Sequence, residues 1–280
     1  MIKTALLSFL VSSVVIPLWK DQTAPTSSGL PADAEEIVNS GWISLVTNPE
    51  LTVYPAENPN GMALLMCPGG GYSGVAISHE GQELAPLMND NGITYAVLKY
   101  RMPNQHPEVP GEDVKEALRI LKSHSIEWGI DTTKIGIGGA SAGGHLASTI
   151  ATHQRENPEF SYQVLLYPVI SMKNGVTHPG SRENLLGENP DENIVDYYSN
   201  ELQVNPTTPQ AFIALSGDDT VVPVKNSIDY FNALNSLGIP VSMHIYPVGG
   251  HGWGNRENFA YSKEWKQELI SWLNSLFPTE

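Results

Sequence analysis

Cysteine and basic residues are scarce in this chain of 280 residues, which argues against internal disulfides and against a nucleic acid partner. Cys67 is the only cysteine, so no disulfide can form within the chain. It ends the apolar run that starts at Met62, which predicts a buried strand residue and neither a nucleophile nor a metal ligand. Lysine and arginine number 15 against 30 acidic residues, for a formal charge of -15. This balance argues against nucleic acid as a partner and suits a neutral substrate.

Long apolar runs are also lacking. The run over residues 5–16 is too short for a transmembrane helix. Because it follows a basic start at Lys3, it is typical of a secretory leader. We expect residues 1–24 to hold a signal peptide and the start of a linker, residues 25–35 to be linker, and the protein to be secreted or periplasmic with no stable membrane insertion beyond the leader. The alternative is an N-terminal amphipathic segment that packs on the domain.

From residue 36 onward the composition shows no break and no internal repeat, so residues 36–280 are expected to form one catalytic domain. Strand-like runs alternate with helical patterns, which predicts an α/β fold with a mostly parallel central sheet and helices on both faces. In such sheets functional sites form at the carboxyl ends of the strands. Strands are expected at 51–54, 62–67, 94–98, 135–138, 163–167, 211–215 and 241–246, and helices at 81–89, 111–128, 144–153, 224–237 and 261–276.

Residues 139–143 read Gly-Ala-Ser-Ala-Gly and fit the nucleophile-elbow pattern G-x-S-x-G. A strand must stop there, turn sharply and enter a helix, and the turn exposes the hydroxyl of Ser141. Glycines two residues before and after the serine let neighbouring backbone approach without a clash. The flanking strand and helix patterns match this requirement, which favours a nucleophile over an incidental serine in a glycine-rich turn.

A second glycine-rich segment, residues 68–72, follows the expected strand at 62–67. Consecutive glycines allow backbone N–H groups to point into a site, where they hold the oxyanion of a tetrahedral intermediate. Gly70 and Gly71, together with the N–H of Ala142, are the expected donors. The loop resembles an HGGG motif but has Pro68 where that motif has histidine, so the histidine side chain cannot position it.

An acid and a base are expected after the last two strands, in the order serine, acid, histidine. Two aspartates compete for the acid. Asp219 has the D-x-V-V-P spacing and is preferred, whereas Asp218 is expected to cap the turn through backbone N–H groups. His251 lies in a glycine-rich loop after the final strand and is expected to exchange the serine proton. His145, which follows the elbow on the helix, is expected to be packed in the core.

These motifs together resemble an α/β-hydrolase of the esterase/lipase type. More narrowly, the chain resembles the acetyl xylan esterase-like carbohydrate esterases of Bacteroidetes. The resemblance implies removal of acetyl or other short acyl groups from hemicellulose, an acetylated carbohydrate as partner and no cofactor. It implies a catalytic Ser141, Asp219 and His251 and an oxyanion hole of Gly70, Gly71 and Ala142. It is carried by CPGGGY at 67–72, HEG at 79–81, LKYRMP at 98–103, GASAGGHLAS at 139–148, THPGSRENLLG at 177–187, DDTVVP at 218–223 and YPVGGHGWG at 246–254.

Tyr72 and Trp253 flank the expected site and are the candidates for substrate binding, with core packing as the alternative. Glu80 and Arg101 are expected to form an ion pair beneath the oxyanion loop. His79 has no second histidine at metal-ligand spacing, so no metal site is expected. Three other functions stay open: a serine peptidase of the prolyl-oligopeptidase type, a feruloyl or general short-chain carboxylesterase, and a non-catalytic binding domain on the same fold.

Overall fold

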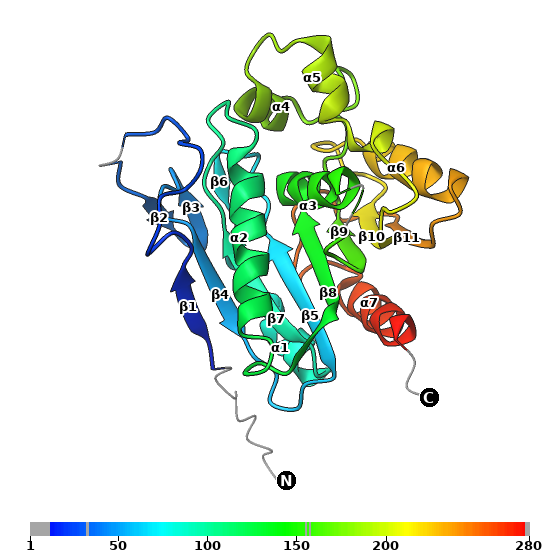
Figure 1. The fold of residues 1–280 in the computed structure, drawn as a ribbon. Helices are drawn as coiled ribbons and strands as arrows, with labels where there is room; N and C mark the ends of the chain where they lie inside the picture. The colour runs from blue at the N-terminus through cyan, green and yellow to red at the C-terminus, as the bar shows by residue number, and fades with distance from the viewer. Residues whose placement is uncertain (1–11, 32–33, 155, 157, 278–280) are drawn as a thin grey trace.

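The central element is an eight-stranded sheet, shown in Figure 1. The computed structural model describes residues 12–31, 34–154, 156 and 158–277. Six neighbouring strands, from β7 to β11 in the sheet, run parallel, and β4 and β1 continue the sheet in antiparallel pairings. In sheet order the strands are β1 (Val14–Pro17), β4 (Glu50–Tyr54), β7 (Thr94–Lys99), β5 (Gly61–Cys67), β8 (Ile130–Ala140), β9 (Tyr162–Leu166), β10 (Gln210–Ser216) and β11 (Val241–Tyr246).

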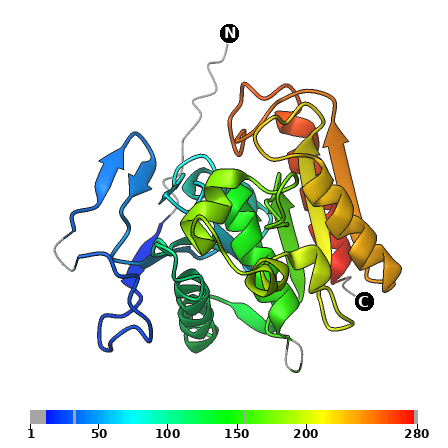
Figure 2. The same cartoon turned by 90° about the horizontal axis from the view of Figure 1, so that it is seen from above.

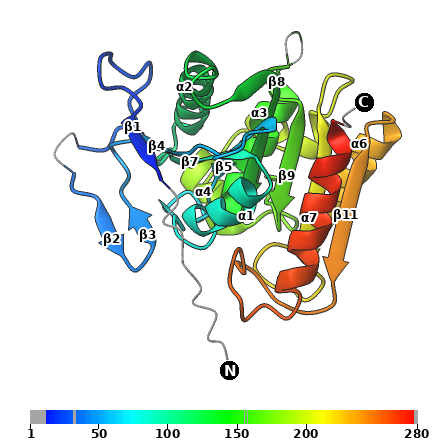
Figure 3. The same ribbon diagram turned by 90° about the horizontal axis from the view of Figure 1, so that it is seen from below.

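Helices cover both faces of this sheet, as the perpendicular views in Figures 2 and 3 show. One face carries α2 (Val109–Ser123), α3 (Ser141–His153) and α6 (Lys225–Ser236). The other carries α1 (Ala85–Asp90) and α7 (Ser262–Leu276). The expected α/β fold with a mostly parallel sheet is confirmed. Within the described residues, no helix is long and apolar enough to cross a membrane.

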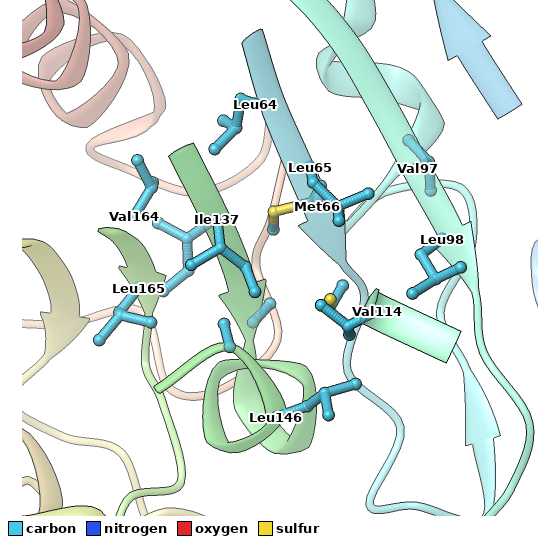
Figure 4. Packing of buried hydrophobic residues seen from close by; sticks show 14 of the residues in the cluster. Leu64, Leu65, Met66, Val97, Leu98, Val114, Ile137, Leu146, Val164 and Leu165 are labelled. Carbon is cyan, nitrogen blue, oxygen red and sulfur yellow. The ribbon is translucent and has the colours of Figure 1, made fainter. Parts of the chain in front are cut away.

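The core lies between the sheet and these helices. Because both faces are covered, the inner strands are buried along nearly their whole length, which explains the continuous apolar run of β5. On α2, Val114, Leu118 and Leu121 recur at helical spacing and are all buried toward the sheet. Figure 4 shows Val114 of α2 and Leu146 of α3 beside the strand side chains that they cover.

Several short elements were not expected from the sequence. A three-stranded sheet is formed by β2 (Ile37–Asn39), β3 (Trp42–Ser44) and β6 (Gly74–Val75). Two helices, α4 (Pro179–Leu186) and α5 (Glu192–Tyr197), lie above the carboxyl ends of the parallel strands in Figure 1. None of these elements exceeds eight residues. Segments this short give no clear hydrophobic period, and tertiary contacts decide their conformation.

The expected leader lies only partly in the described chain, because residues 1–11 fall outside it. Residues 14–17 form the edge strand β1 and pair with β4. Leu18 is buried, and the indole of Trp19 donates a hydrogen bond of 2.7 Å to Asp113 on α2. The described part of the expected leader therefore packs on the domain.

The expected linker has no helix or strand in its described residues, but it is hydrogen-bonded to the domain. Thr26 donates to Glu112 through both its backbone N–H and its hydroxyl, at 3.1 and 2.6 Å. Its carbonyl accepts from Arg101 at 2.6 Å. Arg101 also pairs with Asp113 at 2.8 Å, so the expected Arg101–Glu80 ion pair is wrong. The buried Asp113 carboxylate binds the guanidinium, which also contacts Glu112 at 3.3 Å, and the linker supplies a further acceptor.

Candidate active site

Five loops meet at one edge of the parallel sheet, each following the carboxyl end of a strand. We call the loops after β5, β8, β9, β10 and β11 the catalytic edge. These five strands are neighbours in the sheet, so their loops lie side by side. Every residue expected to take part in the chemistry comes from one of them.

The loop after β8 is a strained elbow that carries Ser141. The φ angle of Ser141 is +53°, in the left-handed region that residues other than glycine rarely adopt. Ser141 is also the first residue of α3. A Cβ atom on Gly139 would come within 2.1 Å of the Gly143 carbonyl oxygen. One on Gly143 would come within 2.0 Å of the Cys67 carbonyl oxygen. The two glycines are thus required by backbone packing, as expected for a nucleophile elbow.

Ser141, His251 and Asp219 form one hydrogen-bonded chain. Nε2 of His251 lies 2.8 Å from the Ser141 hydroxyl, and Nδ1 lies 2.7 Å from Asp219 Oδ2. Because a carboxylate accepts hydrogen bonds, Nδ1 carries its hydrogen toward Asp219, and Nε2 is free to accept from the serine hydroxyl. The Asp219 side chain is 1% exposed, so little water competes for it. The geometry is that of a nucleophile, a base and an orienting acid.

Backbone groups hold both aspartates of the β10 loop, but in different roles. The other oxygen of Asp219 accepts from the N–H groups of Val221 and Val222, each at 2.9 Å. The carboxylate of Asp218 instead accepts from the Gly250 N–H at 2.8 Å. That bond lowers the pKa of Asp218, since it favours the ionised form. Asp218 therefore anchors the loop next to His251.

Gly70 and Gly71 lie in the pocket beside Ser141. Both have positive φ values, +142° and +61°, which glycine adopts without strain. In the part of the chain that the structure describes, no hydrogen bond engages either N–H group. Their carbonyls are held, since Ser73 donates to Gly70 and the Asn184 amide donates to Gly71 at 2.8 Å. Ala142, in the first turn of α3, adds an N–H at the positive end of the helix dipole.

The two aromatic residues expected to bind substrate are core residues in the structure. Tyr72 is 2% exposed, and its hydroxyl hydrogen-bonds to Nδ1 of His145 at 2.8 Å. Trp253 is 3% exposed, donates to the Ser216 hydroxyl and stacks on Phe259. Neither lines the pocket at Ser141. Each satisfies its polar atom inside the protein, which is how buried tyrosine and tryptophan side chains are stabilised.

Five residues line that pocket from outside the catalytic edge: Trp42, Ala76, His79, Glu80 and His178. We call the side chains of Trp42 and His178 the outer wall. Trp42 comes from β3 and is 37% exposed. His178 is the N-cap of α4. The sequence signals for these positions were weak, because Trp42 lies in a three-residue strand. For His178, the only signal was its place at the start of a motif, 177–187, that carries the family resemblance.

The His178 ring is held in one orientation. Its Nδ1 accepts from the Ser181 N–H at 3.2 Å and lies 2.8 Å from the Ser181 hydroxyl. Since a backbone N–H can only donate, the proton of the neutral ring is on Nε2. Burial lowers the pKa of His178, and the nearby His251 lowers it further. The ring therefore offers a neutral N–H donor beside the nucleophile.

Within the described residues, no group of three or more His, Cys, Asp or Glu side chains is arranged to hold a metal ion. The chemistry that the residues themselves can perform is nucleophilic attack by a serine that an imidazole deprotonates. N–H groups next to the serine are placed to bind the developing negative charge.

Comparison with known proteins identifies the family. A model of the prolyl oligopeptidase family matches residues 90–279, which contain the serine, the aspartate and the histidine. The chain is 38% identical over 231 residues to an acetylxylan esterase from Xylanibacter ruminicola, covering 81% of this chain and 48% of that protein. It is 36% identical over 204 residues to endo-1,4-beta-xylanase B from Butyrivibrio fibrisolvens, covering 68% of this chain and 32% of that protein. The chain thus spans about half or less of the length of these curated relatives.

A solved structure matches over nearly the whole of both chains. It is an acetyl ester-xyloside bifunctional hydrolase from Caldicellulosiruptor lactoaceticus, with a TM-score of 0.81 and 34% identity. The match covers 94% of this chain and 96% of that one.

Proposed function

This chain belongs to the prolyl oligopeptidase family of α/β-hydrolases as an acetyl xylan esterase-like serine hydrolase, and we propose that it removes acetyl or other short acyl groups from xylan-type hemicellulose. The hydrogen-bonded chain from Ser141 through His251 to Asp219 carries the proposal. The relatives named for acetyl esters and xylan supply the substrate class.

In the proposed mechanism, the Ser141 hydroxyl oxygen attacks the acetyl carbonyl carbon while Nε2 of His251 takes its proton. The carbonyl oxygen becomes an oxyanion and accepts hydrogen bonds from the N–H groups of Gly70, Gly71 and Ala142. Collapse breaks the bond to the sugar oxygen, which leaves with the proton held by His251. This leaves an acyl group on the serine.

The second half of the cycle regenerates the enzyme. Water gives a proton to His251 and attacks the acyl carbon, and a second oxyanion forms in the same place. Its collapse releases acetic acid and returns the proton to Ser141. Asp219 holds the imidazole in the required tautomer and stabilises its charged form throughout both steps.

The experiment that tests this function is acetate release from acetylated xylo-oligosaccharides, with Ser141→Ala in parallel. Rapid release that the variant abolishes supports both mechanism and substrate class. Serine-dependent cleavage of a simple aryl acetate without release from the oligosaccharide overturns the xylan assignment and supports a general carboxylesterase. Unchanged activity in Ser141→Ala overturns the mechanism.

A peptidase is the second candidate, because the matched family takes its name from prolyl oligopeptidases. Both functions use the same triad, so the leaving group decides between them. A prolyl peptide anilide and an acetylated oligosaccharide should be compared at equal enzyme concentration. Faster cleavage of the anilide would replace the esterase proposal with the peptidase.

We also propose that the apolar N-terminal segment directs export to the periplasm or the exterior. The composition of residues 1–16 supports this. A cut at residue 24 would remove β1, which pairs with β4, and Trp19, which donates to Asp113. Cell fractionation followed by N-terminal sequencing tests the proposal. Exported protein supports it, and full-length chain confined to the cytoplasm overturns it.

A further inference from the structure

Glu80 is a buried carboxylate that the proposed mechanism does not use. Its side chain lies under the catalytic edge, and the residue is 3% exposed. One oxygen accepts from the Gly69 N–H at 2.8 Å, and the other accepts from the Tyr167 hydroxyl at 2.8 Å. In the described chain no lysine or arginine pairs with it, because Arg101 binds Asp113 instead. A carboxylate buried with two hydrogen bonds and no cation is costly, which indicates that these two bonds serve a role.

Tyr167 connects Glu80 to the loop that carries the base. It follows β9 directly and is 1% exposed. Its hydroxyl accepts from the Gly254 N–H at 2.8 Å while donating to Glu80. Its ring also meets the His251 ring edge-on, with 4.8 Å between centroids. Burial and the charge of Glu80 raise the pKa of Tyr167 well above its usual value, so the hydroxyl keeps the proton that it donates.

The loop after β5, which carries the oxyanion donors, and the loop after β11, which carries His251, both pack closely against Glu80. A Cβ atom on Gly69 would come within 2.6 Å of Glu80 Oε2. One on Gly254 would come within 3.2 Å of Glu80 Cγ and within 2.3 Å of the His79 carbonyl oxygen. The same carbonyl accepts from the Asn255 N–H at 2.7 Å. The oxyanion loop and the histidine loop are thus fixed to one short segment, residues 79–80.

We propose that Glu80 and Tyr167 are positioning residues that set the distance between the oxyanion donors and the catalytic base. The bridge runs from the Gly69 N–H through Glu80 and the Tyr167 hydroxyl to the Gly254 N–H. It rests on the proposed acyl-enzyme mechanism, since both loops must meet one tetrahedral intermediate. Glu80 lines the pocket at Ser141, but within the described residues its carboxylate hydrogen-bonds to Gly69 and Tyr167 and not to Ser141 or His251, so it acts through the two loops.

A carboxylate is the side chain that this bridge requires. Gly69 and Tyr167 both donate, so the group between them must accept at two oxygens. The amide in Glu80→Gln accepts at one oxygen and presents an NH₂ group at the other position. With that oxygen on Gly69, the NH₂ faces the Tyr167 hydroxyl, whose own hydrogen then lacks its acceptor. The substitution keeps size and shape but breaks one link.

The test compares Glu80→Gln, Tyr167→Phe and the double variant with wild type. The control is Tyr95→Phe, which deletes another buried hydroxyl that donates to the Gly81 carbonyl at 3.0 Å, close to Glu80 but outside both loops. We measure kcat and KM on an aryl acetate, the rate at which a fluorophosphonate labels Ser141, and thermal stability. The labelling reaction reports oxyanion and base geometry without depending on the natural substrate.

Each single variant is expected to lower kcat and the labelling rate about 10- to 100-fold with KM changed less than about threefold, because a displacement near 1 Å has effects of this size. The double variant should lose no more than the poorer single variant, since both break the same bridge. Tyr95→Phe should keep wild-type kcat at a similar loss of stability.

Wild-type kcat and labelling in a folded Glu80→Gln or Tyr167→Phe protein would overturn the proposal, as would losses that multiply in the double variant. If Glu80→Gln does not fold, Tyr167→Phe decides alone, because it removes a single oxygen atom. Failure of the esterase proposal gives a different result. In that case wild type lacks ester activity or Ser141→Ala retains it, whatever the bridge variants do.

Discussion

The catalytic edge and the outer wall face the same pocket but are built differently. At the catalytic edge, backbone conformation fixes residue type: Ser141 has a positive φ, and Gly139 and Gly143 have no room for a side chain. At the outer wall, Trp42 and His178 lie on short elements, in β3 and at the N-cap of α4. The chemistry therefore depends on backbone constraints, whereas we expect the outer wall to influence the choice of substrate.

The largest effect should arise within the catalytic edge, from two adjacent aspartates. Asp219→Asn leaves the size of the side chain unchanged but presents an amide to His251, which favours the wrong tautomer. We expect kcat to fall about 10⁴-fold, as in other triads. Asp218→Asn is the matched control, since Asp218 binds the Gly250 N–H and not the imidazole. Its kcat on an aryl acetate should stay within about tenfold of wild type.

A reversed ranking of these two variants would assign Asp218 as the acid. It would also contradict the comparison between the catalytic edge and the outer wall, because the conformation of the loop after β10 would then not determine which aspartate orients His251.

A second prediction concerns a buried hydrogen-bonded chain that starts beside the catalytic edge. The Tyr72 hydroxyl, next to the oxyanion loop, donates to Nδ1 of His145, whose Nε2–H donates to the Tyr198 carbonyl in the segment that follows α5. Burial lowers the pKa of His145 from 6.5 to about 4. Between these pH values the unfolded chain binds a proton that the folded chain does not, so stability falls as the pH falls through this window. The loss is about 3 kcal/mol, or roughly 300-fold in the folding equilibrium, and it stops below pH 4.

Urea unfolding at pH 7 and pH 4.5 measures this effect. His145→Gln should be less stable than wild type at pH 7, because it loses two buried hydrogen bonds, but its stability should depend less on pH. The exposed His106→Gln serves as control and should follow wild type at both pH values. An unchanged pH dependence in His145→Gln would show that another group controls acid stability.

The smallest effect is expected at the outer wall. Trp42→Ala removes a half-exposed ring beside Gly70 and Gly74 and leaves the triad untouched. We expect KM for acetylated xylo-oligosaccharides to rise about fivefold, because loss of an aromatic contact costs about 1 kcal/mol. The kcat on an aryl acetate should not change. Leu45→Ala, an exposed apolar residue just after β3 that does not line this pocket, is the control.

If Trp42→Ala lowers kcat on the small ester as much as it raises KM on the oligosaccharide, the outer wall takes part in the chemistry. The two regions would then share one role, contrary to the comparison above.

The same difference explains what could be predicted from the sequence. The α/β fold and its inner strands follow from apolar runs alternating with helical patterns. The segments containing Ser141, Asp219 and His251 were recognisable because glycine-rich loops after strands carry strong local signals. The structure brings these three side chains together in one hydrogen-bonded chain.

What could not be predicted depends on contacts between distant segments. Tyr72 and Trp253 lie beside catalytic residues in the sequence, but their side chains turn into the core. Trp42 is about a hundred residues from Ser141 along the chain and still lines its pocket. Glu80 was recognised as lying beneath the loop, yet its assigned partner was wrong, because Asp113 on α2 competes for Arg101.

The order of the strands has a consequence for the chain while it is still being made. Ser141 follows β8 near the middle of the sheet, whereas His251 lies 110 residues later, after the edge strand β11. Synthesis on the ribosome proceeds from the N-terminus, so a nascent chain exposes its serine long before its base. If His251 is the base, as proposed, we expect the hydrolase to be inactive through most of its translation and to become active only after β11 has docked.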